Sequence, residues 1–160
     1  MNRPVRILMA EDNPQDAELI VRGLRGDGFD PHCERVETEV AFRAGLQHDI
    51  DIVLSDYQMP QFAGLRALDI VKQSGLEIPF ILISGTIGED IAVSAMKNGA
   101  SDYLLKDRLT RLGPAVTQAL AQSKLRKERE RTEEALRESE ERFRQLAENI
   151  HEVFWISDPA

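Results

Sequence analysis

The sequence predicts an α/β fold, a doubly wound five-stranded parallel sheet followed by a long C-terminal helix. Short continuous apolar runs alternate with amphipathic stretches up to about residue 110. Such runs are typical of parallel strands that are buried on both faces, and each parallel crossover needs a return connection, usually a helix. After Pro114 the character changes, because residues 115 to 158 contain neither glycine nor proline.

Five segments are predicted to be strands. Three are apolar runs expected in the centre of the sheet, namely "VRILMA" (5–10), "DIVLSD" (51–56) and "PFILIS" (79–84). Two weaker candidates are expected at its edges, namely "HCERVE" (32–37) and "SDYLLK" (101–106).

Four helices are predicted between these strands. Glycine-containing stretches, Gly26-Asp27-Gly28 and Asn98-Gly99, are expected to end the first and the fourth. The apolar positions that mark the four helices, in chain order, are Ala17, Leu19, Ile20 and Leu24; Val40, Phe42, Ala44 and Leu46; Leu65, Leu68, Ile70 and Val71; and Ile91, Val93, Ala95 and Met96.

Residues from about 109 to 150 are predicted to form one helix, in which charges of both signs are interspersed from Lys124 to Glu148. An a/d pattern of seven-residue spacing predicts that this helix pairs in a homodimer. The alternative is a solvated single helix stabilised by Glu/Arg pairs. The positions of the pattern are Leu136, Ser139, Phe143, Leu146, Ile150 and Val153, of which Ser139 is the polar exception.

The predicted domains are therefore a sheet domain over 1–122, a helical or coiled-coil linker over 123–148, and the start of another domain over 149–160. The last stretch, "HEVFWISDPA", becomes aromatic and β-branched and is expected to open a strand.

Composition limits the possible partners and location. A net charge of −8 and an isoelectric point near 4.9 argue against nucleic acid or an anionic membrane as the main partner. Cys33 is the only cysteine, so no internal disulfide can form, which fits a reducing compartment. No apolar run approaches the roughly 18 residues of a membrane span. We therefore expect a cytoplasmic protein.

Polar side chains follow four of the predicted strands, at the edge where such sheets bind ligands. Glu11, Asp12 and Asn13 follow the first strand, and Asp56, Ser84 and Lys106 end three others. Converging carboxylates without histidine or cysteine favour Mg²⁺. A lysine and a hydroxyl suit phosphoryl oxygens, and an ionised carboxylate can be the nucleophile that accepts the phosphoryl group.

Glu11-Asp12, Asp56, Ser84 and Lys106, with "GASDYLLK" around the lysine, resemble the receiver domain of two-component response regulators over residues 5 to about 122. The resemblance implies the flavodoxin-like receiver fold. It also implies a signalling switch that accepts a phosphoryl group from a histidine kinase or a phosphotransfer protein and catalyses only its own phosphorylation and dephosphorylation.

The resemblance also implies a role for each residue. Asp56 would be the phosphoacceptor and Lys106 the partner of the phosphoryl oxygens. Asp12 and Asp56 would bind Mg²⁺ directly, Glu11 through water, and Gln58 through its backbone carbonyl. Ser84 would be the switch hydroxyl, and Tyr103 the aromatic side chain that changes rotamer with it.

Two positions depart from the family pattern. Asp107 stands where a proline usually follows the lysine, which puts the expected cis peptide in doubt because a non-proline cis bond costs roughly 2.5–4 kcal/mol. Gly85 stands where alanine usually follows the switch hydroxyl, so a looser loop is expected.

Each residue alone also has a simpler interpretation. Asn13, Pro14 and Asp16 suit the start of a helix, Asp56 suits a turn, and Tyr103 suits strand packing. An alternative function is a Mg²⁺-dependent phosphohydrolase with an aspartate nucleophile. Such enzymes typically carry an acid/base aspartate two residues later, and Gln58, which stands there, cannot move a proton.

The segment "ESEERFRQLAENIHEVFWISDP" resembles the helix that leads into a PAS sensor domain and the first strand of that domain. Proteins with this arrangement usually end in a histidine kinase or a diguanylate cyclase, and the sequence does not distinguish the two.

Overall fold

The computed structural model describes the backbone of residues 1–86 and 88–157, and the side chains of 1–86 and 88–150. Contacts divide the chain into two units, 1–123 and 124–160. The first unit holds a five-stranded parallel sheet in the order β2-β1-β3-β4-β5. Its strands are β1 (Arg3–Ala10), β2 (Phe29–Val36), β3 (Ile52–Asp56), β4 (Phe80–Ser84) and β5 (Asp102–Leu105). The predicted fold class and the two predicted edge strands are confirmed.

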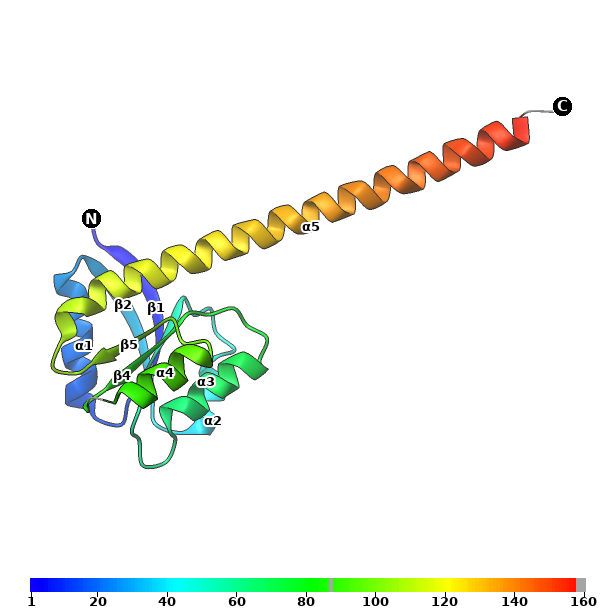
Figure 1. The fold of residues 1–160 in the computed structure, drawn as a ribbon. Coiled ribbons are helices and arrows are strands. Elements are labelled where there is room, and N and C mark those ends of the chain that lie inside the picture. Colours follow the sequence, from blue (N-terminus) through cyan, green and yellow to red (C-terminus); the bar gives the residue numbers. More distant parts are fainter. Residues whose placement is uncertain (87, 158–160) are drawn as a thin grey trace. The chain divides into compact units, whose positions relative to one another are not determined.

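Helices connect the strands and cover both faces of the sheet (Figure 1). They are α1 (Pro14–Gly26), α2 (Glu39–Gly45), α3 (Gly64–Gln73), α4 (Glu89–Lys97), the short 3₁₀ helix η1 (Leu109–Arg111) and α5 (Leu112–Ser157). Gly99, directly after the capping residue Asn98, has φ of +102°, the left-handed conformation in which glycine commonly ends a helix.

The central strands separate two apolar cores because successive side chains of a strand point to opposite faces. On β1, Ile7 and Met9 join the core beneath α1 and the first turns of α5, whereas Leu8 and Ala10 join the core beneath α2, α3 and α4. β3 and β4 are buried along their whole length. Burial on both faces explains why their sequences are continuously apolar.

Two helices bury their apolar residues differently from the prediction. In α2, Phe42 is buried, and so is Leu46, the residue directly after the helix. Val40, in contrast, is 81% exposed. In α4, Ala95 is the one fully buried residue, whereas Val93 and Met96 are exposed. The alternate positions chosen from the sequence do not follow the helical repeat of 3.6 residues, so they cannot all face one side.

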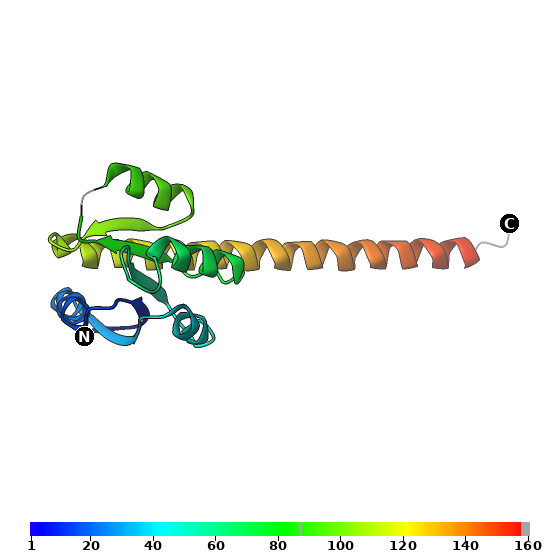
Figure 2. The same cartoon turned by 90° about the horizontal axis from the view of Figure 1, so that it is seen from below.

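The predicted long helix is present as α5, which continues without a break to Ser157 (Figure 2). The expected strand within "HEVFWISDPA" is therefore wrong for residues 151–157, and residues 158–160 lie outside the described residues. A helix satisfies its backbone hydrogen bonds internally, whereas a lone strand has no neighbour to pair with. In the described residues, no helix combines the length and the apolar character needed to cross a membrane.

Candidate phosphoacceptor site

The loop between β1 and α1 brings two acidic side chains to the carboxyl edge of the sheet. Asn13 caps α1 by accepting a hydrogen bond from the Gln15 N–H at 2.9 Å, and Pro14 occupies the first turn. Glu11 is only 1% exposed, and its Oε1 accepts a hydrogen bond from the Asn13 N–H at 3.1 Å. From the edge strand β2, Arg35 donates to the Glu11 carbonyl at 3.0 Å. The loop is thus held from both sides.

Asp56 ends β3 and is 6% exposed. Ala10 pairs with Ser55 across the sheet, so the residues that follow, Glu11 and Asp56, leave the two strands side by side. The start of α3 packs closely here, because a Cβ on Gly64 would press against the Asp56 carbonyl oxygen and lie 2.9 Å from the Tyr57 Cα. Glycine at position 64 is what permits this close approach.

Glu11, Asp12 and Asp56 form one group of carboxylates, with an oxygen from each lying within 4.8 Å of the others. Within the described residues, the buried Oε2 of Glu11 accepts no hydrogen bond, although Lys106 Nζ lies 3.0 Å away as an ion pair. Three carboxylates and an incompletely satisfied buried oxygen fit a hard divalent cation that binds oxygen ligands. The donor set therefore suits Mg²⁺, the cation predicted from the sequence.

Lys106 directly follows β5 and points its ammonium group into this carboxylate group. The backbone N–H of Lys106 donates to the Ser84 carbonyl at 2.8 Å, and this hydrogen bond joins the ends of β4 and β5. Its Nζ lies 3.1 Å from Asp56, 3.0 Å from Glu11 and 2.8 Å from Asp16. Every peptide bond in the described residues is trans, including the bond between Lys106 and Asp107.

Burial and charge shift the protonation of this cluster in opposite directions. Burial raises the pKa of Glu11 from 4.5 to about 7, although Lys106 and the Asn13 N–H act to lower it. Burial would lower the pKa of Lys106, but the carboxylates of Asp16, Glu11 and Asp56 raise it overall. The ion pairs thus favour the charged form of Lys106, whereas burial favours the protonated form of Glu11.

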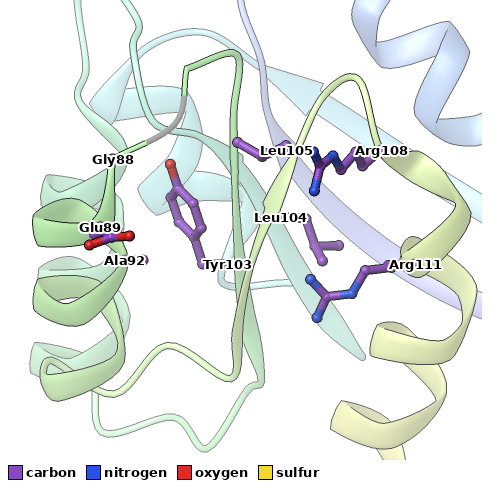
Figure 3. Close-up of a pocket in the computed structure, with 8 residues that line it drawn as sticks. All are labelled: Gly88, Glu89, Ala92, Tyr103, Leu104, Leu105, Arg108 and Arg111. Atoms are coloured by element: carbon purple, nitrogen blue, oxygen red, sulfur yellow. The ribbon is translucent and has the colours of Figure 1, made fainter.

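Ser84 and Tyr103 lie beside this cluster and are linked through one carbonyl. Ser84, buried at the end of β4, donates to the Thr86 carbonyl at 3.1 Å, and the Tyr103 hydroxyl donates to the same oxygen at 2.9 Å. Tyr103 lines a shallow pocket between α4, β5 and the 3₁₀ helix η1, and its hydroxyl lies at the end of the ring nearest Gly88 (Figure 3).

Gln58 lies just beyond Asp56 and is exposed. Its backbone N–H donates to Asp56 Oδ1 at 3.3 Å, so the chain after β3 folds back over the carboxylate. The structure thus brings together Glu11, Asp12, Asp56 and Lys106, with Gln58 adjacent, and joins Ser84 to Tyr103.

Three contacts at the site were missed by the sequence interpretation. Asp16 was interpreted only as a favourable charge at the start of a helix, and its contact with Lys106 joins residues 90 positions apart. Arg35 and the Thr86 carbonyl carry no signal in the sequence, because a long-range side-chain contact and a backbone acceptor leave no pattern.

Comparisons with known proteins identify the family of the chain. Residues 7–117 match the family described as the response regulator receiver domain. The cell cycle transcriptional regulator CtrA of Caulobacter vibrioides is 28% identical over 102 residues, which span 64% of this chain and 44% of that protein. The regulatory protein AtoC of Escherichia coli is 29% identical over 132 residues, 82% of this chain and 28% of that protein. The chain thus spans less than half the length of these relatives.

Solved structures give the same result. A response regulator receiver domain protein from Clostridium thermocellum is 26% identical, with a TM-score of 0.65 over 76% of this chain and 98% of that one. A LuxR-family two-component response regulator from Aurantimonas is 26% identical, with a TM-score of 0.66 over 74% of this chain and 86% of that one. These likenesses favour a receiver over the alternative phosphohydrolase. The chain therefore belongs to the family of response regulator receiver domains, the phosphoryl-accepting signalling switches of two-component systems.

Proposed function

We propose that Asp56 is the phosphoacceptor of this receiver and that Mg²⁺ binds beside it. The observation that carries the proposal is the convergence of Glu11, Asp12 and Asp56 within 4.8 Å, with Lys106 Nζ 3.1 Å from Asp56. Asp12 and Asp56 would bind the cation directly, Glu11 would act through water, and Gln58 would contribute its backbone carbonyl. When bound, Mg²⁺ offsets the negative charge that gathers on the phosphoryl oxygens.

The chain's own groups perform the transfer. An ionised oxygen of Asp56 forms a bond to phosphorus while the bond from phosphorus to the donor histidine nitrogen breaks, and the departing imidazole takes up a proton. Lys106 donates to a phosphoryl oxygen and offsets its charge. Water that attacks the same phosphorus later releases phosphate and restores the Asp56 carboxylate.

The donor is a histidine kinase or a phosphotransfer protein, and the activity of these residues is limited to phosphorylation and dephosphorylation of Asp56. With acetyl phosphate and Mg²⁺, intact-mass analysis should show one base-labile phosphoryl group per chain. Asp56→Asn should show none, and Lys106→Met should show slower labelling while the domain remains folded. Equal labelling of wild type and Asp56→Asn would refute the assignment.

We propose that the second half of α5 forms a homodimer and carries the signal onward. Leu136, Phe143, Leu146 and Ile150 are exposed at a/d spacing, and exposed apolar side chains at this spacing are characteristic of a paired helix. On this proposal residues 1–122 are the receiver, 123–148 the linker, and 149–160 the approach to a PAS-like domain. The protein is cytoplasmic and binds neither nucleic acid nor membrane, in keeping with its net charge of −8.

A further inference from the structure

Lys106 divides its charge among three carboxylates that differ in what else they do. The ammonium group has three N–H donors, and Asp16, Glu11 and Asp56 lie 2.8, 3.0 and 3.1 Å from it. The contacts with Asp16 and Asp56 are hydrogen bonds. Glu11 and Asp56 belong to the carboxylate group that fits a divalent cation, and Asp16 does not.

A cation bound between Glu11, Asp12 and Asp56 therefore shares two carboxylates with the lysine. Two positive charges that draw on the same carboxylates repel each other and compete for them. A lysine whose partners were only Glu11 and Asp56 would stay on the cation's ligands and weaken its binding. A separate carboxylate for the lysine reduces this competition without moving the ammonium group away from Asp56.

We propose that Asp16 is a positioning residue that gives Lys106 a carboxylate of its own, so that the lysine and a divalent cation can occupy the site together. The inference rests on the proposed function of Asp56 and its neighbours. Asp16 suits this role because the first turn of α1 holds it, between the Asn13 cap and the rest of the helix. Its side chain is 31% exposed, so its charge keeps contact with water and needs no metal to offset it.

The first test is Mg²⁺ affinity, measured by calorimetry on the full 160-residue chain without any phosphodonor. Asp16→Asn should weaken Mg²⁺ binding about tenfold, the usual effect of losing a residue that acts on a metal site through its ligands. Asp16→Glu retains a carboxylate at the same place and should recover most of the affinity. Phosphorylation of Asp16→Asn by acetyl phosphate should be slow at low Mg²⁺ and should approach the wild-type rate when Mg²⁺ is saturating.

Two controls separate positioning of the lysine from simple loss of charge. Asp107→Asn removes an exposed acidic group directly after Lys106 and should change Mg²⁺ affinity by no more than about twofold. In a Lys106→Met background, Asp16→Asn should likewise reduce Mg²⁺ affinity by no more than about twofold, because the competing lysine charge is already absent.

Wild-type Mg²⁺ affinity in Asp16→Asn would overturn the inference. An equal loss with and without Lys106 would overturn it too, because Asp16 would then act on the cation directly. If Asp56→Asn abolishes labelling and Asp12→Ala abolishes Mg²⁺ binding while Asp16→Asn behaves as wild type, this inference alone fails. Labelling of Asp56→Asn, or no Mg²⁺ binding by wild type, would reject the proposed site together with it.

Discussion

The hydroxyl groups of Ser84 and Tyr103 donate hydrogen bonds to the same oxygen, the carbonyl of Thr86, at 3.1 and 2.9 Å. The Thr86 N–H in turn donates to Ser84 Oγ at 3.2 Å. One short turn thus connects a buried strand-end hydroxyl beside Asp56 to an aromatic side chain in the pocket beside α4. If Ser84 turns towards a phosphoryl group on Asp56, the shared carbonyl loses one of its two donors and the turn must rearrange.

Ser84→Ala should therefore separate phosphorylation from its structural response. The variant should still accept a phosphoryl group on Asp56. It lacks the hydroxyl that makes different contacts in the phosphorylated and unphosphorylated states, and only an interaction that differs between two states shifts their populations. Amide exchange across residues 88–105 should change with beryllofluoride in wild type and stay nearly constant in Ser84→Ala. Identical responses in the two proteins would contradict this coupling.

The stability of the metal-free protein should fall as pH rises towards neutrality, because the folded state holds Glu11 with a pKa of about 7 against 4.5 for an unperturbed glutamate. A carboxyl group whose pKa is raised by folding stabilises the folded state fully at pH values below its unfolded-state pKa. For Glu11 this contribution is lost as the pH rises through about 7. The loss should amount to about 2 to 3 kcal/mol at most. Urea unfolding between about pH 5 and pH 8 measures it.

The Glu11→Gln variant is the control, since its side chain cannot ionise and this part of the pH dependence should vanish. Mg²⁺ should act in the opposite direction, because a cation needs the ionised carboxylate. The rise in melting temperature caused by Mg²⁺ should therefore grow over the same pH range. A wild-type pH profile that matches Glu11→Gln would show that Glu11 ionises normally.

Gly64→Ala should distort the site through the backbone. The added Cβ would press on the Asp56 carbonyl oxygen and lie 2.7 Å from a Leu82 methyl carbon, so the start of α3 must shift. A loss of roughly 1–3 kcal/mol is expected for such overpacking, together with slower phosphorylation. Gly23→Ala in α1 meets nothing within 4 Å and should instead gain up to about 1 kcal/mol. Urea unfolding of both variants checks the contrast.

The C-terminal half of α5 should be required for dimerisation. Leu146→Asp places a charge among the exposed apolar side chains of the a/d pattern, so the dimer should weaken because a buried unpaired charge is costly. Arg137→Asp lies outside that pattern and is the matched control. Analytical ultracentrifugation of both variants and of a chain ending at Ser123 tests this. A wild-type chain that stays monomeric at high micromolar concentration would reject the dimer.

The central places of β3 and β4 in the sheet could be predicted because both are apolar along their whole length, as strands buried on both faces are. The positions of Asp56 and Lys106 followed as well, since parallel strands bring their carboxyl ends to one edge. Asp16 could not be assigned a partner, because Lys106 is 90 positions away and sequence spacing carries no information about that distance. The strand predicted in "HEVFWISDPA" was wrong for another reason. β-branched and aromatic residues favour a strand only where a neighbouring strand is present to pair with.

The limited burial of α4 has an energetic consequence. Helix α4 fully buries Ala95 and partly buries Ile91 against the core, so displacing it exposes less apolar area, and requires less free energy, than unfolding the domain. Two positions of such a helix can therefore lie within a few kcal/mol of each other. A rearrangement of one turn supplies energy on that scale, because a single hydrogen bond is worth about 1 kcal/mol. The receiver can thus convert the exchange of one or two hydrogen bonds into a change in the populations of two α4 positions, and so in the surface that α4 presents.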